Sequence, residues 1–144
     1  MLYSPINYQG NKSRIVCELL NLIPKDTHVI HEIFCGSAIL SLASDIKCVH
    51  LNDTNHYILD LIEYFRVNTA DEIIRKTDDV IFQYGLTNTY YEGRNVYVEE
   101  KHEGLSRYNK EAYNRLKHDY NEDIDISKLF VLVIYGFNHY LRFN

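Results

Sequence analysis

A strand followed at once by a tight turn, a helix, a second strand and an acidic residue is the feature of this chain that most restricts its fold. The segment 28–34 is rich in valine and isoleucine, which is typical of a buried parallel strand. Gly36 ends it, and residues 38–43 predict a helix directly after the turn. Residues 48–51 predict a second short strand, and Asp53 follows. This order predicts a βαβ unit, which places ligands at the carboxyl ends of its strands.

Helical patterns flank this unit. Apolar residues recur at helical spacing over 13–23, where Pro24 ends the pattern, and again over 55–65. Beyond residue 66 we predict a short helix from 70 to about 83, followed by a loop or hairpin over 84–95. A basic helix from 107 to about 120 comes next, and an apolar helix over 126–144 runs to the last residue.

The predicted basic helix has an apolar side, which we expect to be buried. Its members are Tyr108, Ala112, Tyr113 and Leu116. We therefore divide the chain into a first part over 1–66, an insert or small subdomain over 67–125, and a helix over 126–144 that returns to the first part.

Composition restricts the function classes. With 46% hydrophobic and 24% charged residues the chain is an ordinary globular sequence, and its longest apolar run, 129–135, is too short to cross a membrane. The start of the chain fits no signal peptide. The three cysteines are odd in number and lack metal-ligand spacing, which indicates a reducing, cytoplasmic compartment.

Charge is distributed unevenly. The net charge of −5 argues against a nonspecific nucleic-acid coat, because neutralising phosphates needs a local surplus of Lys and Arg. The segment 107–118 has such a surplus, with four basic side chains and one acidic one. This segment can contact a phosphate backbone, although a solvated helix face explains the same pattern.

Two positions of the βαβ unit suit a nucleoside ligand. Gly36 lets the backbone approach a ligand without an intervening side chain. Asp53 lies 17 residues later, at the end of the next strand, where a carboxylate can accept hydrogen bonds from both hydroxyls of a ribose. The alternative role of Asp53 is to cap the helix that begins near Asn55. The two roles are compatible.

A second segment, residues 8–12 (Tyr-Gln-Gly-Asn-Lys), combines an aromatic ring, a glycine bend and a lysine that can reach a carboxylate or phosphate. A surface turn before a helix, with Lys12 in solvent, is the alternative.

Other candidates have plainer explanations. Seven histidines suggest a metal, but only His28 and His31 have a close ligand spacing, and these two lie across a predicted strand. Cys35 beside a helix start could form an activated thiolate, although packing explains it better. Tyrosines around the predicted loop could stack on bases or could be half-buried: Tyr84, Tyr90, Tyr91 and Tyr97.

Four motifs in order give the chain a family resemblance. They are Tyr-Gln-Gly-Asn-Lys at 8–12, Glu-Ile-Phe-Cys-Gly-Ser-Ala at 32–38, Leu-Asn-Asp-Thr-Asn at 51–55, and Phe-Asn-His-Tyr-Leu-Arg-Phe-Asn at 137–144. In this order and spacing the chain resembles the Dam-type (class alpha) DNA adenine-N6 methyltransferases, over the N-terminal portion of such an enzyme.

The resemblance implies a partial Rossmann-like, doubly wound α/β fold that binds S-adenosylmethionine and carries a mainly helical target-recognition insert. Residues 1–66 then belong to the cofactor-binding domain, and 67–125 to the insert. The cofactor-binding positions that it implies are Tyr8, Gly10, Lys12, Phe34, Gly36, Ser37 and Asp53. Ala38 replaces the family's second glycine. We expect its methyl group to cost little at a helix start but to crowd the cofactor.

Double-stranded DNA is the partner that the resemblance implies, as in restriction–modification enzymes. Basic side chains of the predicted insert and of the last motif are the expected DNA contacts: Arg94, Arg107, Lys110, Arg115 and Arg142. No metal site is expected.

The family's Asp-Pro-Pro-Tyr segment, which holds the flipped adenine, does not occur here, since the only prolines are Pro5 and Pro24. We therefore expect no catalytic residue in this chain and no activity of the chain alone, as for a truncated or split enzyme. The alternatives are a cofactor- or DNA-binding remnant, a subunit that pairs with a separately encoded C-terminal half, or a homo-oligomer formed through an exposed sheet edge.

Overall fold

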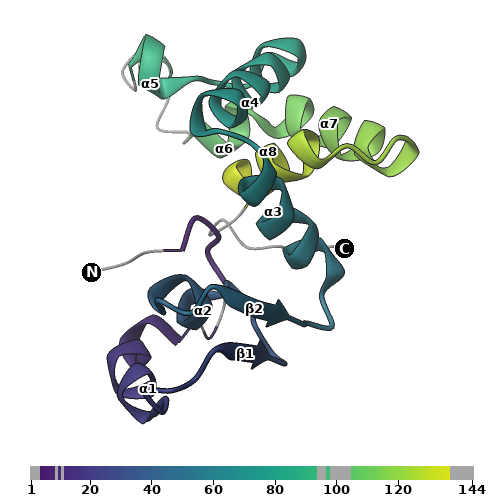
Figure 1. Ribbon diagram of the computed structural model, residues 1–144. Coiled ribbons are helices and arrows are strands. Elements are labelled where there is room, and N and C mark those ends of the chain that lie inside the picture. Colours follow the sequence, from purple (N-terminus) through teal and green to yellow (C-terminus); the bar gives the residue numbers. More distant parts are fainter. Residues whose placement is uncertain (1–3, 9, 11, 94–96, 98–104, 137–144) are drawn as a thin grey trace. The chain divides into compact units, whose positions relative to one another are not determined.

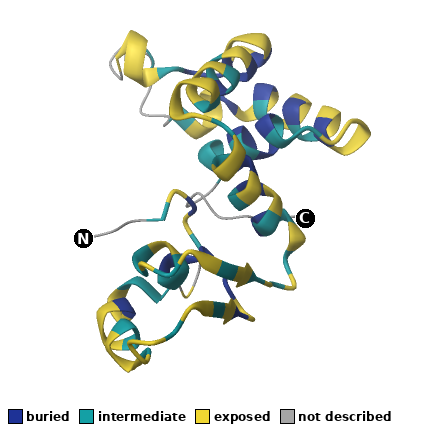
Figure 2. Ribbon diagram, in the orientation of Figure 1, coloured by how far each residue is buried: buried dark blue, intermediate teal, exposed yellow. Residues whose placement is uncertain are grey.

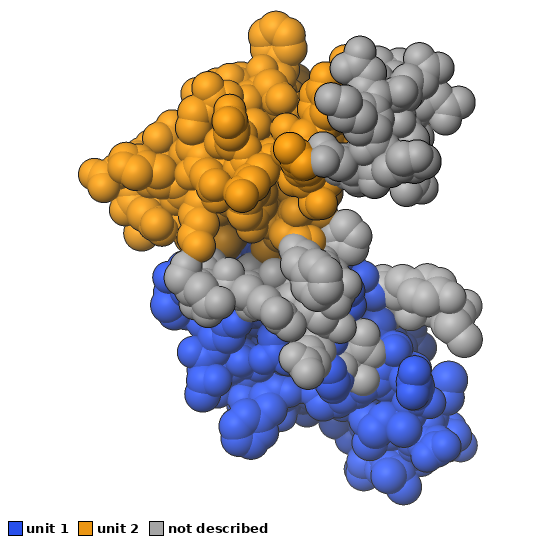
Figure 3. Space-filling model, turned by 180° about the vertical axis from the view of Figure 1, so that it is seen from behind, with its two compact units in different colours: residues 1–66, 140–144 blue, residues 67–139 orange. Residues whose placement is uncertain are grey.

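A computed structural model of the chain describes residues 4–8, 10, 12–93, 97 and 105–136 (Figure 1). The chain divides into two compact units. Unit 1 comprises residues 1–66 with 140–144, and unit 2 comprises residues 67–139 (Figure 3, blue and orange).

The elements of unit 1 follow the predicted order, but the predicted helix over 13–23 is divided into a 3-10 turn and a shorter α-helix. In chain order these are the 3-10 turn η1 (Lys12–Arg14), α1 (Val16–Leu22), β1 (Val29–Glu32), α2 (Ile39–Ala43), β2 (Cys48–Leu51) and α3 (His56–Val67). The second strand has the predicted bounds, whereas β1 is shorter than the predicted 28–34. Helix α2 packs against α1 and η1.

The two strands pair in parallel, with Val29 opposite Cys48 and Glu32 opposite Leu51. Side chains alternate along a strand, so the two strands share an outer face that includes His31 and His50. These rings stack with centroids 4.6 Å apart. The outer face is open to solvent, and the expectation of a buried first strand is therefore wrong. Among the described residues the sheet has only these two strands, so a doubly wound sheet is not present in them.

The core of unit 1 is formed by side chains of α1, α2 and α3, of the turn before α2 and of the segment before η1 (Figure 2, dark blue). Helix α3 is amphipathic, as the sequence predicts, but its buried residues are Ile58, Leu61 and Tyr64, which recur at every third position. The buried apolar side chains of unit 1 are Ile6, Val16, Cys35, Ala38, Ile39, Ile58, Leu61 and Tyr64.

Unit 2 is helical throughout its described part. Its elements are α4 (Ala70–Tyr84), α5 (Thr89–Glu92), α6 (Leu105–Tyr108), α7 (Lys110–Glu122) and α8 (Ile126–Tyr135). A capping box starts α4: Glu72 N donates to Thr69 Oγ1, and Thr69 N donates to Glu72 Oε2 at 2.8 Å. Gly85, in the left-handed region at φ 69°, ends the helix.

Helix α8 packs against α4 and α7, and α4 also contacts α7. These contacts bury the apolar faces of all three helices, as their sequence spacing requires. The buried apolar side chains of unit 2 are Val80, Ile81, Tyr84, Leu86, Ala112, Leu116, Tyr120, Leu129, Val131, Leu132 and Val133.

Three predictions for this part need correction. The segment 84–95, predicted as loop or hairpin, contains helix α5. The predicted basic helix is divided at Asn109 into α6 and α7, and Tyr108, predicted to be buried, is 65% exposed because it lies in α6. Helix α8 begins where predicted and ends at Tyr135; residues 137–144 lie outside the described part of the chain. Within the described ranges, no helix combines the length and apolarity needed to cross a membrane.

Candidate functional site

The turn between β1 and α2 extends the pairing of the two strands beyond their ends. Asn52 N donates to Glu32 O, and Cys35 N donates to Asn52 O, both at 2.9 Å. The turn and the segment after β2 are therefore held together at the carboxyl ends of both strands, where the sequence places the ligand site.

The Asp53 carboxylate links the turn to the segment that precedes α3. Its Oδ2 accepts a hydrogen bond from Gly36 N at 2.8 Å, and its Oδ1 accepts one from Asn55 N at 3.0 Å. The structure thus brings Gly36 and Asp53 together, and it shows Asp53 also binding the backbone just before α3. A carboxylate has about four acceptor positions, so two of them remain for a ligand.

The structure shows a requirement for glycine at position 36 that does not depend on a ligand. A Cβ on Gly36 would lie 2.9 Å from Tyr8 Cδ1, and φ is +50°. The space beside this glycine is therefore occupied by the ring of Tyr8. Burial, followed by the negative charge of Asp53, raises the pKa of the Tyr8 phenol. Tyr8 thus packs against the turn as its neutral form.

Lys12 is bound at the start of the same turn. Its Nζ donates to Glu32 Oε1 at 3.1 Å and to Phe34 O at 2.7 Å. The alternative of a lysine in solvent is therefore wrong. An ammonium has three N–H donors, and these partners take two of them.

The remaining predicted cofactor positions differ in how far they are exposed. The Phe34 side chain is 73% exposed, and Gly10, at φ +77°, has open space around it. Ser37 is buried, and its carbonyl accepts a hydrogen bond from Ser4 Oγ at 2.9 Å. Its own Oγ is buried and has no hydrogen-bond partner among the described residues.

Ala38 adopts the left-handed conformation, at φ +53°, before α2. The expectation that its methyl group costs little here is wrong, because this conformation is unfavourable for any L-residue other than Asn or Asp. A glycine at this position would adopt the same conformation freely.

Cys35 is 1% exposed. Burial, with the nearby charges of Asp53 and Glu32, raises the pKa of its thiol to about 11. The thiol is therefore protonated at neutral pH, and packing, not nucleophilic chemistry, explains this residue.

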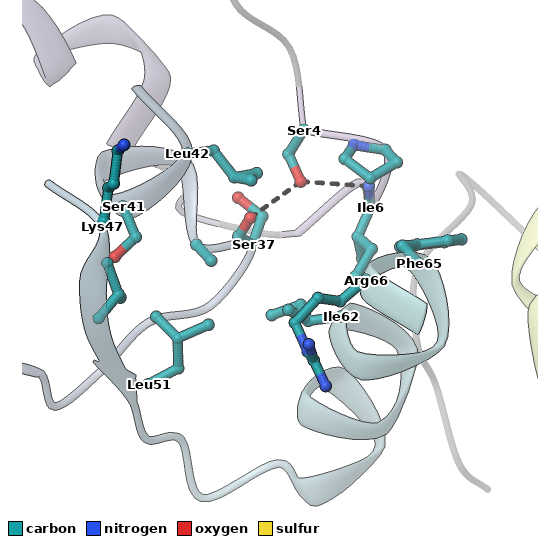
Figure 4. A pocket seen from close by; sticks show the side chains of 13 residues that line it. Ser4, Ile6, Ser37, Ser41, Leu42, Lys47, Leu51, Ile62, Phe65 and Arg66 are labelled. Atoms are coloured by element: carbon teal, nitrogen blue, oxygen red, sulfur yellow. Dashed lines mark hydrogen bonds between the residues drawn. The ribbon is translucent and has the colours of Figure 1, made fainter. Parts of the chain in front are cut away.

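A cavity of about 400 Å³ lies beside the turn (Figure 4). Its walls are mainly apolar and come from α2, β2, α3 and the segment before η1, with Lys47 and Arg66 at its edge. Of the predicted cofactor positions only Ser37 lines it. Because Asp53 is not among the lining residues, we place the candidate nucleoside site at the turn and not in this cavity.

Sequence reasoning missed three residues that hold the turn: Glu32, Ser41 and Ser4. Glu32 is a buried acid at the end of β1, and its Oε2 accepts from Ser41 Oγ at 2.6 Å. The signal for both was present in the sequence, since Glu32 is an acidic residue inside the predicted strand 28–34 and Ser41 interrupts an apolar helix.

The predicted DNA-contacting side chains are dispersed over the second half of the chain. Arg107 in α6 and Lys110 in α7 are exposed. Arg115 donates to Tyr84 O at 3.0 Å and so satisfies a carbonyl at the end of α4. Arg94 and Arg142 lie outside the described residues.

The tyrosines near α5 divide into two kinds. Tyr84 is buried and donates to Asp119 Oδ2 at 2.8 Å; burial and this carboxylate raise its pKa to about 12. The Tyr97 ring packs edge-on against Tyr108. Tyr91 is exposed but donates to Asp78 at 3.2 Å, whereas Tyr90 is 87% exposed. Tyr90 is thus the most available of the four for stacking. No cluster of three or more potential metal ligands occurs in the part of the chain that the structure describes.

The comparisons with known proteins agree with these motifs. Residues 8–144 match the family of D12 class N6 adenine-specific DNA methyltransferases. The chain is 26% identical over 141 residues to the modification methylase StsI of Streptococcus sanguinis and 23% identical over 141 residues to the type II methyltransferase M.FokI of Planomicrobium okeanokoites. It is 27% identical over 143 residues to the modification methylase LlaI of Lactococcus lactis subsp. lactis.

Each of these matches covers 98% of this chain but only 19% to 20% of the relative, so the chain spans about a fifth of the length of the curated relatives it matches. The family match extends over almost all of the chain and includes the turn and Asp53. The chain therefore belongs to the D12 class N6 adenine-specific DNA methyltransferase family.

Proposed function

We propose that this chain forms the S-adenosylmethionine-binding portion of a DNA adenine-N6 methyltransferase, built on part of a Rossmann-like, doubly wound fold, with a helical recognition insert beyond residue 66. The observation that carries this proposal is the 2.8 Å hydrogen bond from Gly36 N to Asp53 Oδ2 at the carboxyl ends of two parallel strands. This edge of a parallel sheet is the usual place for a nucleotide cofactor.

The residues present fit that cofactor. Two acceptor positions of Asp53 remain for the ribose hydroxyls, and one N–H of Lys12 remains for a carboxylate. The ring of Tyr8 and the exposed side chain of Phe34 add apolar surface beside the turn. When bound, S-adenosylmethionine supplies an activated methyl group.

In the complete enzyme we propose direct transfer of that methyl to the amino nitrogen of a flipped adenine in double-stranded DNA, with catalysis mainly by positioning. The exposed Arg107 and Lys110 are proposed to contact DNA phosphates. The 144 residues contain no Asp-Pro-Pro-Tyr segment, so another polypeptide segment must supply it.

Binding tests the cofactor site. We expect the chain to bind S-adenosylmethionine in isothermal titration calorimetry, and Asp53→Ala to weaken binding at least tenfold, because the ribose loses its acceptors. Asp53→Asn, which keeps one carbonyl acceptor, should weaken it less. Asp60→Asn, at an exposed position of α3, is the matched control. Equal affinity of Asp53→Ala and the wild type would refute the assigned site.

A second candidate role is pairing with a separately encoded half of the enzyme. The exposed outer face of the two-stranded sheet favours it, as does the lack of a further paired strand among the described residues. We expect no methyl incorporation into DNA by the 144 residues alone, and incorporation when a family polypeptide with an Asp-Pro-Pro-Tyr segment is added. Activity of the chain alone would contradict this expectation. Sedimentation distinguishes such pairing from a homo-oligomer.

A further inference from the structure

Glu32, the last residue of β1, is a carboxylate that is only 6% exposed. A buried carboxylate is strongly unfavourable unless hydrogen bonds or an opposite charge compensate it. Here Oε1 accepts from Lys12 Nζ at 3.1 Å, and Oε2 accepts from Ser41 Oγ at 2.6 Å and from Ser41 N at 3.3 Å. The carboxylate therefore connects three segments that are distant in sequence, η1, β1 and α2.

Through Lys12 the same carboxylate reaches the turn. Lys12 Nζ also donates to Phe34 O at 2.7 Å, so the ammonium lies between the end of β1 and the backbone just before Gly36. A free lysine side chain has many rotamers, and a cation that must meet a ligand loses that freedom on binding. Two bound N–H groups hold the ammonium in place before any ligand arrives.

We infer that Glu32 is a positioning residue: it fixes the Lys12 ammonium at the turn so that the third N–H of Lys12 can bind the carboxylate of the methionine part of an adenosyl ligand. Glu32 itself does not touch the ligand in this arrangement. The inference rests on the proposed function, and it assigns to the site a residue that acts only through another.

A double-mutant cycle on the full chain tests this role. We compare the wild type, Glu32→Gln, Lys12→Met and the double variant, with Glu18→Gln, an exposed glutamate of α1, as the control. The ligands are S-adenosylmethionine and adenosine, which has the ribose but no carboxylate. Glu32→Gln should weaken S-adenosylmethionine binding about tenfold in the wild type and less than twofold in the Lys12→Met background. Adenosine binding should change less than twofold in every variant.

The reactivity of Lys12 provides a measurement that needs no ligand. Competitive acylation followed by mass spectrometry should show Lys12 reacting several times faster in Glu32→Gln than in the wild type, with Lys25 as an internal standard. Unchanged reactivity of Lys12 overturns the inference. If Glu32→Gln does not fold, Lys12→Met decides: loss of S-adenosylmethionine binding with adenosine binding retained supports the inference, and any other pattern overturns it.

The outcomes separate the inference from the proposed function. A wild-type chain that binds both ligands, with an unchanged affinity of Glu32→Gln for S-adenosylmethionine, overturns the role of Glu32 and leaves the proposed function standing. Equal weakening for both ligands also overturns it, because a merely structural role would affect both. A wild-type chain that binds neither ligand overturns the proposed function and this inference together.

Discussion

At the scale of single residues, Ala38 is the non-glycine residue of the turn whose backbone is strained, at φ +53°. The left-handed conformation costs an L-residue about 1–2 kcal/mol, and a new glycine costs about 0.4–1 kcal/mol through the entropy of the unfolded chain. Ala38→Gly should therefore raise the free energy of unfolding by about 0.5–1 kcal/mol, measured by urea denaturation.

Gly36→Ala is the matched opposite change in the same turn. Its φ is also positive, but a Cβ there would meet the ring of Tyr8 at 2.9 Å, so we expect a loss of about 2 kcal/mol or more. If Ala38→Gly lowers the stability, or if both changes have the same sign, the strain at Ala38 is not what limits this turn.

Cys35 should make the free energy of unfolding fall at alkaline pH. Its thiol pKa is raised to about 11 by burial, above the value of about 8.5 in an unfolded chain. Between these values the unfolded state has lost the proton and the folded state keeps it. The stability contribution of the neutral thiol is thus complete below pH about 8.5 and is lost as the pH rises through about 11.

The free energy of unfolding, measured by denaturant titration from pH 8 to 11, should fall more steeply in the wild type than in Cys35→Ala, by up to about 1.4 kcal/mol per pH unit. Cys48→Ala, at an exposed cysteine, should keep the wild-type slope. Identical slopes for Cys35→Ala and the wild type would show that this thiol does not titrate as its burial requires.

At the scale of elements, a buried polar network fixes the segment after α4. Thr87 N donates to Asn109 Oδ1, and Asn109 Nδ2 donates to Thr87 Oγ1, both at 2.9 Å. The phenol of Tyr135 donates to Thr87 O at 2.5 Å. The segment between α4 and α5 is thereby joined to the start of α7 and the end of α8.

Asn109→Ala leaves two buried groups of Thr87 without a partner, so we expect it to lower the free energy of unfolding by about 2–3 kcal/mol. Asn114→Ala, at an exposed position of the same helix, should change it by less than about 0.5 kcal/mol. Urea denaturation of the two variants measures the difference. Equal effects would mean that the hydrogen bonds of Asn109 contribute nothing net.

This network also explains which elements the sequence could predict. Helices and strands with clear periodicity, such as α3 and β2, follow from local pattern alone. The break at Asn109 does not, because its side chain binds Thr87, 22 residues earlier in the chain. Local spacing therefore predicted one continuous basic helix and placed Tyr108 on its buried side.

The candidate site shows the same limit. The meeting of Gly36 and Asp53 could be predicted, because carboxyl ends of adjacent parallel strands lie at one edge. The partners of Glu32 could not, since they depend on how η1 and α2 pack onto the strand end. The left-handed backbone conformation of Ala38 could not be predicted from composition or spacing either.

At the scale of the whole molecule, the two units differ in how their elements are covered. The strands of unit 1 are four residues long, and a sheet of two such strands is marginal by itself. In unit 2, by contrast, α4, α7 and α8 bury their apolar faces against each other. Local stability follows buried apolar contact, so the units should open at different free energies.

Native-state hydrogen exchange with mass spectrometry tests this difference. Amide hydrogens of α4, α7 and α8 should exchange at least tenfold more slowly than those of β1 and β2. Saturating S-adenosylmethionine should then slow exchange in the strands and the turn at Gly36, because a ligand stabilises the state it binds, and it should leave α7 unchanged. Strands that are as protected as α8 without ligand would contradict the expected order, and ligand protection confined to α7 would contradict the assigned site.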